Sequence, residues 1–460
     1  MTHGKKQKTG SVLKTVGFIA MGCPKNMVDA EAMLARIGMA GYVLTDDADN
    51  ADIVIINTCG FIAPAKEEAL QAIRNALKQK KKGRIRKVIV TGCLSERMGK
   101  DLLAEAGDID AIVGLAGRDS IDKILKEIET QEPSKSTHLC LGPLPTEAPD
   151  DRTRLRITPL HWAYLRISEG CNRKCSFCTI PAIRGNFRSK PMESVLEEAQ
   201  KLVDSGAVEL SIIAQDSNFY GRDMGIKDGL IQLINQLEKI PSLKWIRLMY
   251  LYPAGIDDNL IAAIADSPKV VRYADVPIQH INDDILKTMR RAHTKTSTTE
   301  LIEKLRRAMP DIVLRTTVIA GFPGETESQF HELLDFIRQT EFDALGCFPF
   351  YPEPGTPAAE LPGQLPEQVR QNRSEQIMLI QQPIAFKKVR NRIGSRLTVL
   401  VDENNPEQAV GRFYGQAPHI DSVCLIRRRD IKPGTFIDAE VIGQDGYDTV
   451  VKPVKNKPAH

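Results

Sequence analysis

Three cysteines in the stretch SEGCNRKCSFCTIP (168–181) lie close enough together to bind one inorganic group. Cys171, Cys175 and Cys178 are spaced by four and then three residues, in a chain with nine cysteines. Zinc needs four ligands, normally including a second pair of cysteines or histidines, and no such pair follows. Three thiolates instead hold three irons of an iron–sulfur cube and leave the fourth iron open to a ligand that is not protein. The spacing therefore predicts a 4Fe-4S cluster here, with three packed structural cysteines as the alternative.

A second set of three cysteines is spread over the first hundred residues. Cys23, Cys59 and Cys93 each stand at or just past the end of a short apolar stretch typical of a buried strand. Parallel strands gather ligands at the edge where their carboxyl ends meet, so these distant cysteines can converge. A lone buried cysteine behaves as a small hydrophobe, but three at equivalent positions predict a second 4Fe-4S cluster. Neighbouring glycines would let the backbone approach it closely, at Gly22, Gly60 and Gly92.

The elements that must position this second set alternate between strand and helix from residue 16 to residue 129. Such alternation predicts an α/β domain over 1–130, a doubly wound parallel sheet with helices on both faces. Strands are expected at 15–20, 51–57, 86–91 and 110–114, and helices at 28–39, 65–77 and 121–129. Five prolines without any apolar period follow, which predicts a linker over 131–160.

From residue 164 the alternation resumes on a longer scale. It predicts an incomplete (β/α)6 barrel over 161–390, with chemistry at the carboxyl ends of its strands. The Cys171 loop follows the first of these strands, so the open iron is expected to face the barrel mouth, and Arg173 and Lys174 can offset the negative charge of the cluster. Strands are expected at 163–168, 208–214, 245–251, 271–278, 311–321 and 343–350, with helices at 192–205, 229–239, 327–339 and 366–390.

The tail, residues 391–460, has short alternating stretches separated by Gly, Pro, Asn and Asp. This pattern predicts a small antiparallel β-barrel. Its strands are expected at 396–403, 408–413, 422–427, 435–443 and 447–453. The tail holds ten basic and nine acidic side chains, whereas a single-purpose RNA-binding domain is usually more basic.

Composition places the chain among globular proteins without a membrane span. Its apolar share is 42%, its net charge is +3, and no apolar run reaches eighteen residues. The N-terminus imitates a signal peptide, but Lys14 interrupts an apolar stretch that is already too short. We therefore expect a cytoplasmic protein, whose clustered cysteines bind metal rather than form disulfides. Basic runs at 78–87, 387–396 and 427–429 are either solvated faces or docking surfaces for ribosomal RNA or protein.

The first cysteine loop closely resembles the motif of the radical S-adenosylmethionine superfamily. Together with the second set, the linker and the tail, it makes the chain resemble the methylthiotransferase family over residues 16–454. Within that family the match is closest to the group that modifies an aspartate of ribosomal small-subunit protein uS12. The tRNA-modifying relatives typically carry Gln-Met-Asn where this chain has Pro24, Lys25 and Asn26, whereas Met21 departs from the leucine common in the uS12 group. The stretches that carry the match are 21–31, 57–62, 90–94, 161–189 and 411–424.

This resemblance implies a fold, cofactors and site residues. The tail corresponds to the TRAM domain, and the cofactors are two 4Fe-4S clusters and S-adenosylmethionine, which serves as methyl donor and as radical source. Phe177 would pack on the adenine of S-adenosylmethionine, and Gln215 would hold the amino group of its methionine part. The carboxylate of S-adenosylmethionine would neutralise Arg315. The backbone near Gly321 would read the adenine. Two further residues would project towards the same mouth, Gln279 and His280, although the histidine is equally well explained as structural. The remaining cysteines are assigned to structure, namely Cys140, Cys347 and Cys424.

The activity implied is methylthiolation of a C–H bond. Sulfur on the second cluster takes a methyl group, and a deoxyadenosyl radical removes hydrogen from the β-carbon of the target aspartate. The reacting atoms must then meet within about 3–4 Å in a water-poor cavity, so the linker and the tail are expected to pack against the barrel. The partners would be uS12, free or in the small subunit, a sulfur donor, and an electron donor such as flavodoxin or ferredoxin. The alternatives are the same chemistry on a tRNA adenosine, a non-catalytic iron–sulfur protein that binds RNA, and a structural zinc module.

Overall fold

The computed structural model describes residues 14–130 and 137–454, so the basic residues that precede Lys14 lie outside the described part. The chain forms two compact units, each described by itself below. The first contains the residues up to 145 together with 153–155, and the second contains 146–152 and the residues from 156 onward.

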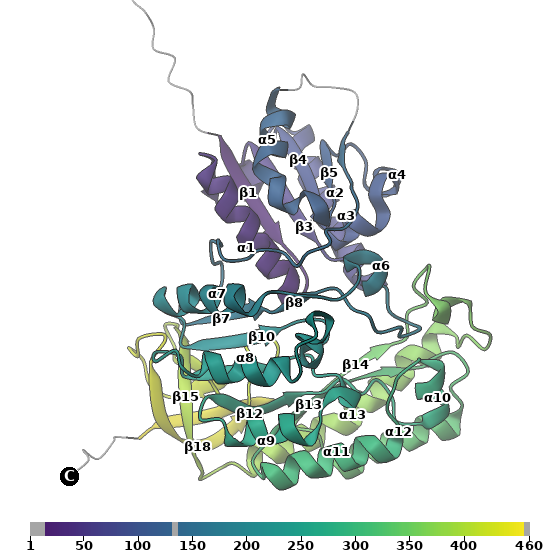
Figure 1. The fold of residues 1–460 in the computed structure, drawn as a ribbon, viewed down its shortest axis with the longest axis vertical. Coiled ribbons are helices and arrows are strands. Elements are labelled where there is room, and N and C mark those ends of the chain that lie inside the picture. Colours follow the sequence, from purple (N-terminus) through teal and green to yellow (C-terminus); the bar gives the residue numbers. More distant parts are fainter. Residues whose placement is uncertain (1–13, 131–136, 455–460) are drawn as a thin grey trace, which may run out of the picture. The chain divides into compact units, whose positions relative to one another are not determined.

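The first unit is a six-stranded parallel sheet with the strand order β2-β1-β3-β4-β5-β6 (Figure 1). Its central strand β3 is buried along its whole length, which is why it reads as a continuous apolar run. Alternate residues of β3 pack on opposite faces, Ile53 and Ile55 towards α1 and α5, and Val54 and Ile56 towards α2 and α4. The doubly wound sheet that the sequence predicts is therefore confirmed. The elements are β1 (Thr15–Ala20), α1 (Pro24–Met39), β2 (Val43–Thr45), β3 (Ile53–Thr58), α2 (Ala63–Lys81), β4 (Lys87–Gly92), α3 (Cys93–Met98), α4 (Leu102–Ala106), β5 (Ala111–Val113), α5 (Ile121–Thr130) and β6 (His138–Cys140).

The two outer strands of this sheet, β2 and β6, were not expected. Each has only three residues, which is too short for an alternating pattern to stand out. β6 pairs with β5 in parallel, with Ile112 opposite Leu139, and it lies inside the segment predicted to be a linker. The proline-rich stretch therefore begins as part of the first sheet, and Cys140 belongs to a strand.

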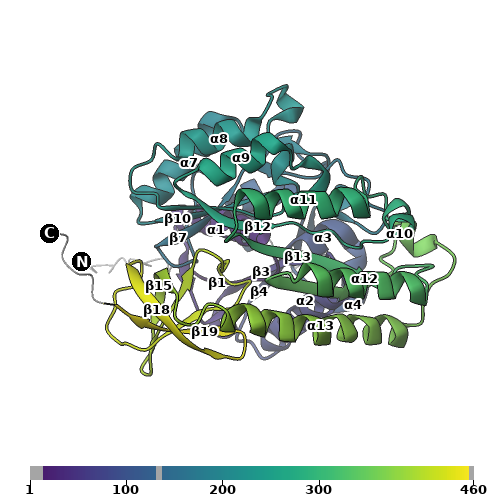
Figure 2. The same ribbon diagram turned by 90° about the horizontal axis from the view of Figure 1, so that it is seen from below.

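The second unit is built on six parallel strands in the order β14-β13-β12-β11-β10-β7 (Figures 1 and 2). Residues such as Leu210, Ile212 and Leu248 point outward and form one core with the surrounding helices. The incomplete (β/α)6 barrel is thus confirmed. Its elements are β7 (Trp162–Arg166), β8 (Ser168–Glu169), α6 (Ile180–Arg184), β9 (Arg188–Ser189), α7 (Met192–Asp204), β10 (Glu209–Ile213), α8 (Gly229–Leu237), β11 (Trp245–Leu248), α9 (Asp258–Asp266), β12 (Val270–Asp275), α10 (Asp283–Thr288), α11 (Lys295–Ala308), β13 (Val313–Ala320), α12 (Glu327–Thr340), β14 (Ala344–Pro349) and α13 (Glu367–Arg390).

The same unit ends in a closed five-stranded barrel with the order β15-β16-β17-β19-β18. Four of its strand pairs are antiparallel as expected, but β17 and β19 are parallel, with Leu425 opposite Val450. A closed barrel leaves no unpaired sheet edge, which explains how such short strands remain stable. The strands are β15 (Arg396–Asn404), β16 (Ala409–Phe413), β17 (Cys424–Ile426), β18 (Phe436–Asp445) and β19 (Asp448–Pro453).

The small barrel packs on the amino ends of the large-barrel strands, as Figure 2 shows for β15 beside β7 and β10. The Nη1 atom of Arg412 lies 2.7 Å from Oε2 of Glu209, the first residue of β10. The loop after β16 adds a hydrogen bond from the Tyr164 hydroxyl to the carbonyl oxygen of Pro418 and another from the Tyr273 hydroxyl to Asp421. The tail therefore packs against the large barrel, as expected.

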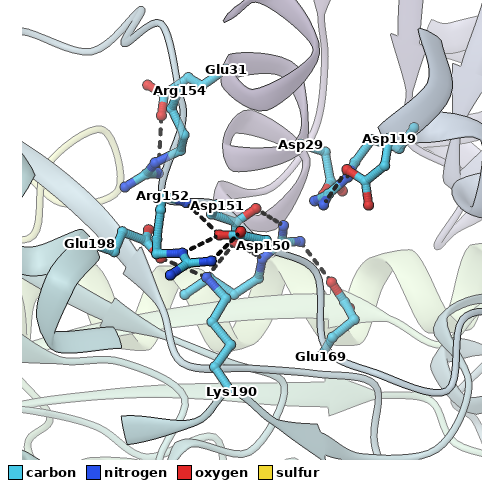
Figure 3. Close-up of polar contacts among 12 residues, drawn as sticks. Asp29, Glu31, Asp119, Asp150, Asp151, Arg152, Arg154, Glu169, Lys190 and Glu198 are labelled. Carbon is cyan, nitrogen blue, oxygen red and sulfur yellow. Dashed lines mark hydrogen bonds and ion pairs between the residues drawn. The ribbon is translucent and has the colours of Figure 1, made fainter. Parts of the chain in front are cut away.

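A buried charge network fixes the part of the predicted linker that belongs to the second unit (Figure 3). Both oxygens of Asp151 accept hydrogen bonds from Arg166, at 2.9 and 2.7 Å, and Lys190 lies 2.6 Å from Oδ2. Lys190 also reaches Glu198 at 2.7 Å. Asp151 is only 1% exposed, so this proline-rich stretch is a packed strap and not a flexible tether.

Candidate iron–sulfur sites

The first three cysteines meet at the carboxyl edge of the first sheet. β1, β3 and β4 are neighbours, and their register sets Ala20 opposite Asn57, and Asn57 opposite Thr91. Cys23 caps α1, Cys59 follows β3, and Cys93 opens α3. The amino end of α1 therefore points its partial positive charge at this edge, which favours thiolates there.

Two glycines allow the three cysteine loops to approach each other. Gly22 has a φ of 87°, and a Cβ atom placed on it would lie 2.6 Å from the Cβ of Cys59. A Cβ on Gly60 would lie 2.7 Å from the Cα of Leu94, next to Cys93. The structure thus explains both glycines, because they make room for the loops to pack against one another.

Asn26 ties the same loops together, a role that the sequence did not reveal. Its Nδ2 donates to the carbonyl oxygens of Met21, at 3.2 Å, and Thr58, at 2.8 Å. The thiol of Cys93 donates to its Oδ1 at 3.4 Å. Asn26 is fully buried. It follows Pro24 and Lys25 in the motif, and its side chain holds the loops of Cys23, Cys59 and Cys93 in place.

The other three cysteines occupy the loop after β7 and β8, at the carboxyl end of the large barrel. The amide of Cys171 donates to the Gly185 carbonyl oxygen at 3.1 Å, and that of Cys178 donates to the Cys175 carbonyl oxygen at 3.2 Å. Ser176 anchors the loop from the other side, since its amide donates to Met289 at 3.0 Å. The loop is therefore held on two sides, with its three thiols within eight residues.

Burial favours the protonated form of two of these thiols. It raises the pKa of Cys171 to about 11 and that of Cys178 to about 12. Iron must therefore displace their protons when a cluster binds. Across residues 14–130 and 137–454, no three His, Cys, Asp or Glu side chains converge on a point where one metal ion would bind. An iron–sulfur cube needs no such point, because each of its thiolates binds a different iron.

Buried polar atoms without partners mark where a polar cofactor fits. Side chains alternate along a strand, so the residues that follow the outward-facing Leu210, Ile212 and Ala214 face the inside of the barrel. Two of these, Ser211 and Gln215, have a buried side-chain oxygen without a hydrogen-bond partner among the described residues. Buried polar atoms are normally paired, so these oxygens favour a ligand with amino or hydroxyl groups. The same holds for Ser168 Oγ and Asp216 Oδ1.

Some of the residues predicted to bind the cofactor have polar atoms without a partner in the protein, whereas others already form hydrogen bonds within it. Gln215 donates from Nε2 to Glu169 at 2.9 Å, and its unpaired Oε1 could accept from an amino group. Phe177 packs beside the apolar cluster around Phe322 and Phe350, so its contact with adenine stays a prediction. The amide of Gly321 is occupied by Glu325 at 3.0 Å, which leaves only its carbonyl for recognition.

Arg315 requires a correction. Asp275 lies 2.8 Å from it and Asp421 lies 3.4 Å away, and Arg315 stands near the amino end of β13, whereas the cysteines lie at the carboxyl end of the barrel. Two protein carboxylates thus supply the charge that we expected a cofactor to supply. An arginine in an apolar strand does need a partner of opposite charge. The partners of Arg315 lie on β12 and in the small barrel, which are distant in sequence, so the local pattern does not show them.

The two residues of the VPIQH stretch behave differently. His280 is fully buried, accepts the Asn282 amide on Nδ1 at 3.0 Å, and lies 3.5 Å from Glu325 through Nε2. Its Nε2 has no hydrogen-bond partner among the described residues, so both the structural and the functional explanation of His280 stay predictions. Gln279 is partly exposed and has a φ of 70°, a strained backbone conformation for a residue with a side chain. Such strain clusters at functional sites, so Gln279 remains a candidate for contact with substrate or cofactor.

The other cysteines fit their assignment to structure. Cys347 packs on the core beside the large barrel, and the thiol of Cys424 donates to Gln416 at 3.2 Å. Burial raises the pKa of Cys140 to about 11 and that of Cys347 and Cys424 to about 12.

Three segments of the chain match models of known protein families. Residues 165–337 match the model of the radical SAM superfamily, 393–454 match the TRAM domain, and 15–114 match the uncharacterized protein family UPF0004. The solved structure of the radical S-adenosylmethionine methyltransferase TsrM from Kitasatospora setae, with cobalamin and a 4Fe-4S cluster bound, aligns with a TM-score of 0.55. It shares 15% identity over 75% of this chain and 77% of TsrM, which shows likeness of fold alone.

Two relatives are similar over nearly their whole length. The ribosomal protein uS12 methylthiotransferase RimO of Syntrophomonas wolfei subsp. wolfei is 41% identical, covering 95% of this chain and 99% of the relative. That of Geobacter sulfurreducens is 42% identical, covering 95% and 97%. The chain belongs to the radical S-adenosylmethionine methylthiotransferases, in the RimO family of ribosomal protein uS12 methylthiotransferases.

Proposed function

We propose that this chain adds a methylthio group to the β-carbon of an aspartate of ribosomal protein uS12. The observation that carries the proposal is the pair of cysteine triads, each at the carboxyl edge of a parallel sheet, in a chain similar along its whole length to uS12 methylthiotransferases. The triads suit two 4Fe-4S clusters, held by Cys23, Cys59 and Cys93 and by Cys171, Cys175 and Cys178. When bound, the clusters and S-adenosylmethionine supply the radical, the methyl group and a site for the sulfur.

The residues of the large barrel bind, orient and exclude water. Gln215 Oε1 would accept from the cofactor amino group, and the buried hydroxyls of Ser168 and Ser211, which have no partner among the described residues, would bind other polar groups of the cofactor. The loop after β16 packs on the amino ends of the barrel strands through Tyr164, Arg247 and Tyr273. Closing that end keeps water from a reactive radical and aims hydrogen removal at one carbon.

The partners follow from this chemistry. The enzyme would need a one-electron donor such as flavodoxin or ferredoxin and a source of sulfur, and it would act in the cytoplasm on free uS12 or on the small subunit. Among the described residues, no helix is long and apolar enough to cross a membrane.

The experiment that tests the proposal is the intact mass of uS12 from cells with and without the gene. We expect uS12 to be heavier by one methylthio group only when the gene is present. A gene-complemented strain carrying Cys175→Ala serves as the control for catalysis and should give the unmodified mass. An unchanged uS12 mass in all strains would contradict the proposal and move the substrate to a tRNA adenosine.

A further inference from the structure

Two arginines lie over one tyrosine ring beside the barrel cysteines. The guanidinium carbons of Arg173 and Arg291 lie 3.9 and 4.1 Å from the centroid of Tyr252. Arg173 belongs to the cysteine loop, whereas Arg291 follows α10, more than a hundred residues later in the chain. The backbone amide of Arg173 donates to Cys171 Sγ at 3.4 Å within this loop. The Arg291 side chain reaches the same loop from outside it, since its Nη1 donates to Cys175 Sγ at 3.7 Å.

Tyr252 is a rigid platform for this pair. Its amide donates to Asn218 Oδ1 at 2.9 Å, and Asn218 Nδ2 donates back to its carbonyl oxygen at 2.8 Å. At the other end of the ring, its hydroxyl accepts the Ala292 amide at 3.0 Å. The ring is fixed at both ends and is 6% exposed, so the guanidiniums are positioned by the barrel and not by chance surface contacts.

Among the described residues, one carboxylate, that of Asp216, lies beside the two positive charges at this ring. Arg173 has Asp216, with Nε to Oδ2 at 2.7 Å. Arg291 forms no ion pair with a carboxylate among the residues that the structure describes. Its Nη2 donates to the neutral Pro277 carbonyl at 2.6 Å, and its Nε is buried without a hydrogen-bond partner. Two guanidiniums and one carboxylate leave one excess positive charge at this ring, and the second anion that this loop would provide is a thiolate-bound cluster.

We propose that Arg291, stacked on Tyr252 with Arg173, is a positioning residue that holds Cys175 and raises the reduction potential of the barrel cluster. Reduction adds one electron, and so one negative charge, to the cluster. A fixed cation within contact distance of a cluster thiolate stabilises the reduced form more than the oxidised form. The proposal rests on the proposed function only in that this loop binds a cluster.

The test is a redox titration of the barrel cluster, followed by electron paramagnetic resonance in the full-length chain. Cys23→Ala, Cys59→Ala and Cys93→Ala are included in every sample, so that the barrel cluster is the one being measured. Arg291→Gln should lower the ratio of reduced to oxidised cluster at a given potential by about tenfold, which is about 59 mV for a one-electron couple. Arg291→Lys keeps the charge and should retain most of the parent potential.

The matched control is Arg272→Gln, which removes the same charge from an exposed arginine paired with Asp311 on the same barrel. It should leave the potential unchanged. A fully iron-loaded Arg291→Gln chain with the parent potential would overturn the proposal. If Arg291→Gln fails to hold iron, the Arg291→Lys variant decides the test. An iron-loaded Arg291→Lys cluster with a potential near that of the parent supports a role for the charge. Loss of the cluster in both variants overturns the proposal. If the redox titration gives the expected shift but the unaltered gene does not change the uS12 mass in cells, the proposed substrate is refuted and this inference stands.

Discussion

The Nε atom of Arg173 donates a hydrogen bond to Oδ2 of Asp216 at 2.7 Å, which joins the cysteine loop after β7 to the end of β10. Asp216 is 2% exposed, and burial raises its pKa although Arg173 beside it favours the ionised carboxylate. The loop that would bind the cluster is thus fastened to the neighbouring strand by a charged contact within the barrel.

Replacing Asp216 should therefore loosen this loop. A hydrogen bond to a charged group is worth about 1.5–3 kcal/mol, so Asp216→Ala should weaken cluster occupancy at the barrel site by roughly ten- to a hundredfold. Iron and sulfide analysis after anaerobic reconstitution measures this. Asp258→Ala removes an exposed carboxylate paired with Lys304 and should leave the iron content unchanged. Full iron content in Asp216→Ala would show that the loop does not depend on this contact.

Gly22 should be required for the other cluster. Gly22→Ala places a methyl group 2.6 Å from the Cβ of Cys59, so the cysteine loops must separate. We expect loss of the iron held by the first unit while the barrel cluster remains. Gly41→Ala is a matched control, because Gly41 has a similar φ of 93° but nothing within 4 Å of the added carbon. Equal iron loss in both variants would attribute the effect to backbone strain instead of to the approach of the loops.

The two cysteine triads should be separable by activity. Changing Cys23, Cys59 and Cys93 to Ala should abolish methylthiolation but preserve reductive cleavage of S-adenosylmethionine to 5′-deoxyadenosine. Changing Cys171, Cys175 and Cys178 should abolish both. Chromatography of 5′-deoxyadenosine together with uS12 mass distinguishes the two outcomes, and Cys140→Ala should change neither. Cleavage that survives loss of the barrel triad would contradict the assignment of that site.

Asp151 should contribute strongly to the stability of the second unit. Its removal leaves Arg166 and Lys190 buried near each other without this partner, and breaking such a buried pair costs about 3–5 kcal/mol. Asp151→Ala should lower the urea midpoint of this unit, measured by circular dichroism and tryptophan fluorescence. The adjacent Asp150→Ala breaks a contact with the exposed Arg152 and should have no comparable effect. Similar urea midpoints in both variants would show that the buried contacts of Asp151 do not stabilise this unit.

The contact between the two barrels should weaken in acid. Although burial by itself would raise it, the hydrogen bond from His161 and the charge of Arg412 hold the pKa of Asp402 below its usual value. A depressed carboxyl pKa stabilises the fold above its ordinary value of about 3.9, and this stabilisation is lost as the pH falls through the lower folded value. As the pH falls from 5 to below the ordinary carboxyl pKa, the free energy of unfolding of Asp402→Asn should therefore decrease less than that of the parent. Parallel pH profiles in urea unfolding would contradict this role.

Local pattern was sufficient for most of the architecture. Continuous apolar runs such as Ile53–Ile56 and the alternation in 396–403 predict strands because burial on both faces or on one face selects those patterns. Cys171, Cys175 and Cys178 lie within one short loop, so their spacing alone predicts a cluster. The second triad was predictable because parallel strands place their ends together.

The sequence by itself determined which cysteines are candidates to bind the two clusters, since that depends on residue type, local spacing and strand order. The tertiary structure decided which charges are already paired. Arg315 resembles a cofactor ligand in its strand, yet Asp275 and Asp421 neutralise it, and Arg291 has no local signal at all but lies against Cys175. Likewise, β2 and β6 are too short to show a period and exist only because neighbouring strands offer hydrogen bonds. The physical reason is that partners distant in sequence supply both the charge and the hydrogen bonds, and a window of neighbouring residues contains neither.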